Sequence, residues 1–190
     1  MAEQNSNDRR IKMTRMILKE ALTELMKEQP LHEISIKKIC ETADINRSTF
    51  YHHYASQYEL YDSIVSDVAV KLGNIIKEGM EKDEKTTKVL TDILSVIEKN
   101  RELALILLTN NSNFSLGDDF TQIVTGFITG GRAKTELSVY CTQFILAGFT
   151  SIIILWLNNE QRKSAREVAM LLNALIMHGV KRAAAFSGKD

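Results

Sequence analysis

Apolar residues recur at intervals of three and four positions through most of the chain, a spacing that is typical of amphipathic helices. The first such stretch covers residues 8–27, and Pro30 ends it. Residues 1–8 are polar and are expected to form a flexible arm. With one proline and nine glycines in 190 residues, the sequence contains few helix breakers and predicts an all-α fold. Later helices are expected over 86–99, 101–110, 118–130, 136–158 and 162–186.

Two short helices are predicted after the first one. Ser35 and Asn46 are residue types whose side chains accept hydrogen bonds from the free amides at a helix N-terminus. These caps predict helices over 36–43 and from Arg47 to about His53, each too short to be stable alone.

A third cap begins a long helix. Ser56 is followed three residues later by Glu59, which completes a capping box for a helix running to about Gly79. Because the two short helices need partners, they are expected to pack against this helix and the first one. The sequence therefore predicts a small three-helix module joined to a long connecting helix.

The stretch 36–54, IKKICETADINRSTFYHHY, has the spacing of a helix-turn-helix. Asp44 falls where the turn requires left-handed backbone, which Asp tolerates better than most residues. Phe50 is expected to point inward from the second short helix, and Tyr54 is a further candidate. The other residues expected to pack inward are Ile36, Ile39, Cys40, Ala43 and Ile45.

The remaining side chains of the second short helix are expected to face outward. They comprise one cation, two hydroxyls, a phenol and two imidazoles, and no acid, so each can donate a hydrogen bond to a phosphate or a base edge. Lys37 and Lys38, with Arg9 and Arg10, extend the positive side. This surface predicts binding to double-stranded DNA. The outward residues of the helix are Arg47, Ser48, Thr49, Tyr51, His52 and His53.

The overall charge does not favour nucleic acid. The chain has 24 basic and 24 acidic residues, and its first sixty residues hold nine of each. DNA binding therefore requires that the charges separate by face. The acids Glu20, Glu24 and Glu28 recur at helical spacing on the first helix, away from the donor-rich side chains, so such a separation is expected.

The segment from Ser35 to Leu60 resembles the DNA-binding domain of the TetR family of transcription regulators. The run 48–54, STFYHHY, resembles the recognition helix of that family, and the match covers about residues 9–65. The resemblance implies two domains: a helix-turn-helix domain over 1–55, and a helical effector-binding and dimerisation domain over 56–190.

The resemblance also implies roles for single residues. Base edges or nearby phosphates would be approached by Arg47, Ser48, Thr49 and His52. Phosphates would be contacted by Ser35, Tyr51 and Tyr54, and Lys37 and His53 complete the predicted DNA-binding set. The sequence departs from the family where Asp44 replaces the usual glycine of the turn, and where Ala55 and Gln57 replace a proline and a lysine. Loss of that lysine should remove one phosphate contact.

The helix predicted over 136–158 is apolar around much of its circumference. One thick core would explain this, and so would a homodimer in which this helix and the last one pack against their copies, as in the TetR family. We favour the homodimer, because burial on two sides explains a helix with two apolar sides. The residues expected at the interface are Phe149, Ile152, Ile153, Trp156, Leu172, Leu175 and Ile176.

A sensing cavity for an unknown small-molecule effector is expected in the C-terminal domain, mostly apolar with few polar groups. Aromatic residues at helical spacing are more often plain core, and that alternative stays open. The candidate lining residues are Met80, Phe114, Phe120, Phe127, Tyr140, Gln143 and Phe144.

Several classes of protein are disfavoured. No nucleophile, base and acid arrangement indicates an enzyme, and no cofactor motif is present. His52 and His53 are adjacent on a helix and diverge by about 100°, so no metal site is expected. Cys40 and Cys141 are expected to be small buried hydrophobes in a reducing cytoplasm. The apolar run 144–157, fourteen residues long, is too short to span a membrane.

The sequence thus predicts a DNA-binding transcription regulator. Its expected form is a ligand-responsive repressor that binds a palindromic operator as a dimer. An adaptor or co-activator of the same fold, acting mainly through another protein, is the alternative, and an enzyme with its site in the C-terminal domain is a more distant one.

Overall fold

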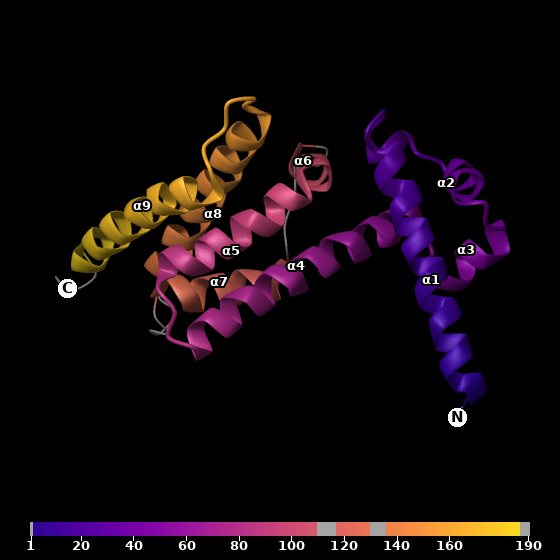
Figure 1. Ribbon diagram of the computed structural model, residues 1–190, viewed down its shortest axis with the longest axis horizontal. Coiled ribbons are helices and arrows are strands. Elements are labelled where there is room, and N and C mark those ends of the chain that lie inside the picture. Colours follow the sequence, from indigo (N-terminus) through magenta and orange to yellow (C-terminus); the bar gives the residue numbers. More distant parts are fainter. Residues whose placement is uncertain (1, 110–116, 130–135, 187–190) are drawn as a thin grey trace. The chain divides into compact units, whose positions relative to one another are not determined.

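The structure, a computed structural model, describes residues 2–109, 117–129 and 136–186. These residues are mainly helical, and no strand occurs among them, which confirms the all-α fold class (Figure 1). They divide into two compact units: one holds the described residues up to Asp67 with Thr109, and the other holds Val68–Leu108 and the described residues after 116. The elements are α1 (Ala2–Leu25), the 3-10 helix η1 (Leu31–Glu33), α2 (Ile36–Ala43), α3 (Arg47–His53), α4 (Gln57–Glu81), α5 (Thr86–Lys99), α6 (Arg101–Thr109), α7 (Gly117–Thr129), α8 (Glu136–Asn158) and α9 (Ala165–Phe186).

Two helix starts differ from the sequence prediction. Helix α1 begins at Ala2, so the flexible arm expected over 1–8 is instead helical from that residue. The segment contains neither proline nor glycine, so nothing stops the helix from extending toward the N-terminus. Helix α9 begins at Ala165 because Ser164 and Glu167 form a capping box: Ser164 N–H donates to Glu167 Oε2 (2.9 Å), and Glu167 N–H donates to Ser164 Oγ (3.3 Å).

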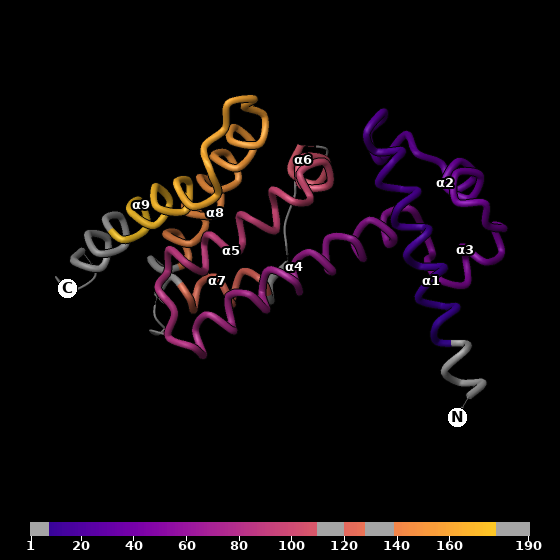
Figure 2. The backbone as a smooth tube through the Cα atoms, viewed as in Figure 1, coloured from indigo at the N-terminus to yellow at the C-terminus, as the bar shows by residue number. Residues whose placement is uncertain are grey.

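Helices α1, α2 and α3 and the first turns of α4 form the N-terminal unit, which Figure 2 traces from α1 onward. Helix α1 contacts α2, and α2 contacts α3. Leu18, Leu22, Ile39, Phe50 and Leu60 are fully buried and supply the centre of this core. Burial of these side chains holds together two helices that are too short to persist in isolation.

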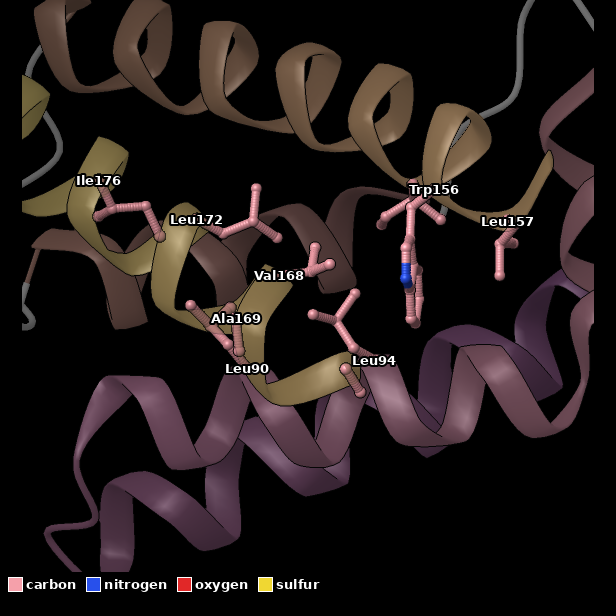
Figure 3. Close-up of a cluster of buried hydrophobic side chains, with 10 residues drawn as sticks. Leu90, Leu94, Trp156, Leu157, Val168, Ala169, Leu172 and Ile176 are labelled. Atoms are coloured by element: carbon pink, nitrogen blue, oxygen red, sulfur yellow. The ribbon is translucent and has the colours of Figure 1, made fainter. Parts of the chain in front are cut away.

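Helices α5, α8 and α9 form a core in the second unit (Figure 3). Leu90 and Leu94 of α5 are buried in one cluster with Trp156 of α8 and Leu172 of α9. The indole N–H of Trp156 donates to the carbonyl oxygen of Lys163 (2.7 Å), so the buried ring leaves no polar atom unpaired. This core packs the C-terminal helix α9 against α5 and α8.

This core includes part of the predicted dimer interface. Most of the residues assigned to contacts with a second copy pack inside their own chain, because α8 is apolar on two sides and the sequence pattern does not tell which side turns inward. Leu175 is exposed, and Ile152 is half-buried against the core. Phe149 is likewise half-buried against the core, and the predicted residues that are buried within it are Ile153, Trp156, Leu172 and Ile176.

Helix α8 remains widely exposed. Phe144 is 80% and Leu155 73% exposed, and Tyr140 also lies on the surface. Among the described residues, Val139–Asn158 is the one stretch long and apolar enough to cross a membrane by length and composition, which is longer than the fourteen residues expected from the sequence. One such helix is weak support for membrane insertion, since helices of soluble proteins pass the same test.

Candidate functional site

The turn between α2 and α3 has the geometry that the sequence predicted. Asp44 adopts left-handed backbone, with φ 51° and ψ 46°. The amide of the next residue, Ile45, donates to the carbonyl oxygen of Cys40 at 2.9 Å, the bond that characterises a Schellman end to a helix. The chain therefore reverses sharply after Ala43 and begins α3 within three residues.

Side-chain caps fix both short helices. Ser35 Oγ accepts a hydrogen bond from Lys38 N–H (3.2 Å) at the start of α2. Asn46 Oδ1 accepts from Ser48 N–H (3.0 Å) and from Ser48 Oγ (3.1 Å) at the start of α3. Each cap satisfies an amide that the helix leaves unpaired, so the starts of α2 and α3 match the predicted ones.

The inner side of α3 is aromatic. Phe50 is fully buried, and Tyr54 is 4% exposed, with 6.1 Å between the two ring centroids. The hydroxyl of Tyr54 accepts a hydrogen bond from Ser63 Oγ (3.3 Å) on α4. Tyr54 is thus a core residue, in line with the prediction that it points inward from α3. The predicted phosphate contact of this side chain is corrected, because its hydroxyl points into the packing of α4.

The outer side of α3 carries the predicted donors. Tyr51 is 58% exposed, Thr49 and His53 are half-buried, and the rings of His52 and His53 approach to 5.2 Å between centroids. No acidic side chain stands in α3. We call this outer side of α3 the donor face. Its exposed residues are Arg47, Ser48, Tyr51 and His52.

Two predicted residues of α2 lie beside this turn. Ser35 is exposed, and its hydroxyl hydrogen is not used in the cap bond, so the group can still donate. Lys37 is exposed and faces Glu41, with 3.7 Å between Nζ and Oε1. This ion pair is solvent-exposed and weak, so the ammonium group remains accessible to a stronger anion such as a phosphate.

Sequence reasoning missed Arg15. Its guanidinium carbon lies 5.7 Å from the ring centroid of Tyr54. Burial, the charge of His52 and the charge of Arg15 together lower the pKa of His53 below its usual value. Arg15 therefore adds a cation beside α3. The signal in the sequence was its spacing: Arg15 precedes the buried Leu18 and Leu22 by three and seven residues and shares their helical stripe.

A cavity of about 140 Å³ lies within the second unit. Two of the candidates named from the sequence, Phe120 and Phe127, line it, and Phe114 lies outside the described residues. Among the described residues, the cavity is lined by Val68, Leu72, Ile76, Leu90, Ile93, Ile97, Ala104, Leu107, Leu108, Phe120, Val124, Phe127, Leu146, Phe149, Thr150, Ile153 and Ile176.

The other predicted pocket residues are wrong for this cavity. Met80, Tyr140, Gln143 and Phe144 are exposed and do not line it. The prediction favoured aromatic residues, but most of the wall is aliphatic. Val68, Leu72 and Ile76 of α4 repeat at intervals of four, a stripe that the sequence already displayed.

A second surface consists of exposed apolar side chains on α8 and α9. We call it the α8–α9 apolar surface. Its members are Val139, Tyr140, Phe144, Leu155, Met170, Leu171, Leu175 and Met177. Within the described residues, no group of three or more His, Cys, Asp or Glu side chains could hold a metal ion.

A capped helix-turn-helix with a donor-rich second helix, followed by a helical domain, defines a DNA-binding transcription regulator. Residues 17–64 match the family model of bacterial regulatory proteins of the tetR family, and residues 84–178 match that of a transcriptional regulator C-terminal region. The chain belongs to the TetR family. The matched families are regulators rather than enzymes, in agreement with the sequence prediction.

Individual relatives agree with this assignment. The chain is 22% identical over 167 residues to the HTH-type transcriptional regulator YxbF of Bacillus subtilis, a match that covers 84% of this chain but only 43% of YxbF. A TetR transcriptional regulator from Streptococcus agalactiae has the same fold, with a TM-score of 0.67, 22% identity, and coverage of 91% of this chain and 98% of that one. FadR from Bacillus subtilis, solved in complex with stearoyl-CoA, gives a TM-score of 0.65 at 16% identity and covers 85% and 96%.

Proposed function

We propose that this regulator is a cytoplasmic, ligand-responsive repressor that binds a palindromic operator as a homodimer. The observation that carries the proposal is the donor face of α3, whose exposed side chains are Arg47, Ser48, Tyr51 and His52 and which contains no acid. Hydrogen-bond donors without neighbouring carboxylates suit phosphates and the acceptor edges of bases in the major groove.

The α8–α9 apolar surface supports the homodimer. Several large apolar side chains are exposed on these two helices, and exposed apolar surface is a common mark of an interface. A two-fold dimer buries the same surface on both copies and presents two α3 helices, which matches a palindromic site. The interface residues proposed here are exposed ones, such as Phe144 and Leu175, and Leu175 also belongs to the set predicted from the sequence.

The cavity supports a small-molecule effector. Helix α4 supplies Val68, Leu72 and Ile76 to the cavity wall, and the same helix begins in the DNA-binding unit. A ligand that prefers one position of α4 would thereby prefer one arrangement of the DNA-binding helices. The solved complex of FadR with stearoyl-CoA shows a ligand bound to a protein of this fold. We propose that the effector weakens operator binding.

The DNA-binding proposal is tested by fluorescence anisotropy with a palindromic site selected from random DNA by the purified protein. Ala substitutions of Arg47, Thr49 and Tyr51 should each weaken binding by about 1–3 kcal/mol. Arg162→Ala removes the same charge as Arg47→Ala from a residue that pairs with Glu98 (3.4 Å), and should leave binding unchanged. Intact binding by the Thr49 and Tyr51 variants would refute the assignment of α3.

One observation favours a second function, that of an adaptor acting through another protein. Ala55 and Gln57 stand where the family has a proline and a lysine, and Ala55 N–H is bound to Glu59 Oε2 (2.5 Å). If the purified protein selects no DNA but forms a stable complex with another protein, the adaptor function is supported and the repressor function is refuted.

A further inference from the structure

The cavity of the second unit is almost free of polar side chains. Among the described residues that line it, Thr150 is the one polar residue, and none carries an ionisable group. The remaining side chains come from α4 to α9 and are aliphatic or phenylalanine. A charged ligand group placed here would lose its hydration without gaining an ionic partner, which is among the most costly burials in a protein.

The size of the cavity limits its ligand. Its volume of about 140 Å³ is close to that of an engineered, hydrocarbon-lined cavity of about 150 Å³ in another protein, which stays free of water and binds benzene. An apolar molecule that fills such a cavity gains dispersion contacts with its wall. A molecule with a single ring therefore fits this cavity as it stands.

Thr150 sets the position of a polar group on such a ligand. Its hydroxyl can donate one hydrogen bond and accept others, so it can pair with an alcohol, a phenol or a carbonyl. A neutral group at this position is recognised by hydrogen bonding alone. The other described residues of the wall, which include Leu72, Phe120 and Phe149, have no polar side-chain atom to offer.

We propose that the effector cavity selects a small uncharged molecule of about one aromatic ring, with at most one neutral polar group directed at Thr150. This inference rests on the proposed function, in that it names the class of effector for the same cavity. A cavity built around an ion pair would differ, because there a charged side chain would bind a carboxylate or ammonium group of the ligand.

The test compares four compounds of similar size: toluene, benzyl alcohol, benzoate and benzylammonium. Binding to the full-length protein is measured by thermal shift and by titration calorimetry at neutral pH. Toluene and benzyl alcohol should bind saturably, and benzoate and benzylammonium should bind at least tenfold more weakly. Tighter binding of either charged compound would overturn the proposal.

Two variants locate the site. Thr150→Val keeps the shape of the side chain and removes the hydroxyl, so benzyl alcohol should lose affinity while toluene keeps it. Ala104→Leu fills part of the cavity and should weaken both neutral ligands. Met80→Ala, at an exposed residue of α4 outside the cavity, is the matched control and should bind like the unmodified protein. Unchanged affinity for both ligands in both cavity variants would place binding elsewhere and refute the proposal.

Operator binding is measured in the same samples, which separates the two proposals. If the neutral compounds bind the cavity without changing DNA affinity, the ligand class is correct and the ligand-responsive function is wrong. If a charged compound releases the operator and the neutral ones do not bind, the inferred ligand class is wrong and the responsive function stands.

Discussion

The guanidinium of Arg15 on α1 lies over the ring of Tyr54, with 5.7 Å between its central carbon and the ring centroid. Tyr54 is the residue that ends α3, and its ring is buried against Phe50. The contact therefore joins the first helix to the end of the donor face. It gives Arg15 two roles, one in stability and one in the charge beside the proposed DNA surface.

Replacement of Arg15 should separate these roles. Arg15→Ala should lower the free energy of unfolding by about 0.5–1 kcal/mol, the usual value of an exposed cation–π contact, and should also weaken operator binding. Arg15→Lys should restore most of the DNA affinity, because it restores the charge. Urea denaturation and anisotropy measure the two effects. An alanine variant as stable as the unmodified protein would show that the stacking contact contributes nothing.

Operator binding should depend on pH through His53. Burial, His52 and Arg15 lower the pKa of this imidazole below its usual value of 6.5, so it is neutral at pH 7. As the pH falls through this lowered pKa, His53 gains a positive charge near phosphate, and affinity for DNA should rise. His53→Gln should reduce this rise, whereas His32→Gln, which changes an exposed imidazole on η1, should not.

The same group should affect stability with the opposite sign. The unfolded chain takes up the proton near pH 6.5, whereas the folded chain holds His53 neutral to a lower pH. The contribution of neutral His53 to the free energy of unfolding is therefore fully present above pH 6.5. It is lost as the pH falls from 6.5 through the lowered pKa. Thermal denaturation between pH 7.5 and 5 measures this loss, and His53→Gln should make it smaller. An equal loss in the variant would contradict the assignment to His53.

The α8–α9 apolar surface predicts a dimer that a single charge disrupts. Phe144→Glu or Leu175→Glu would bury an unpaired carboxylate in the interface and should weaken dimerisation by about 100-fold or more. Met80→Glu introduces the same charge at an exposed apolar residue of α4 and should leave the dimer intact. Analytical ultracentrifugation measures the association. A protein that is monomeric without any substitution would rule out the proposed interface.

Two glycines should respond to alanine in opposite directions. A Cβ at Gly79 of α4 would overlap Cγ2 of Val89, which is fully buried and β-branched and so cannot move aside easily. Gly79→Ala should therefore destabilise the protein by about 1–3 kcal/mol. A Cβ at Gly126 of α7 meets no atom of the described residues within 4 Å, so Gly126→Ala should stabilise the helix by about 0.5–1 kcal/mol. Urea denaturation of both variants tests this contrast, and a shift in the same direction for both would contradict it.

The local parts of the structure could be predicted from the sequence. The bounds of α2 and α3 agree with the predicted ones, since the caps Ser35 and Asn46 act within one turn of themselves. The left-handed Asp44 was predictable for the same reason, because the requirement of the turn and the tolerance of the residue are both local.

The parts that depend on packing were not predictable in this way. Helix α8 is apolar on two sides, and only the tertiary fold places Ile153 and Trp156 inward and Phe144 and Leu155 outward. The preference for aromatic residues likewise missed the largely aliphatic cavity. Arg15 was overlooked because its partner, Tyr54, is distant in the sequence, and no periodic pattern connects residues on different helices.

The hydrocarbon wall around Thr150 has a consequence for how such a regulator would behave in a cell. Protein–DNA affinity falls steeply as salt rises, because bound phosphates release counterions. Occupancy of a chamber without ions by an uncharged compound is insensitive to salt and to acidity. Changes in ionic conditions would therefore alter how tightly the operator is held while leaving the affinity of the DNA-free protein for the compound unaltered.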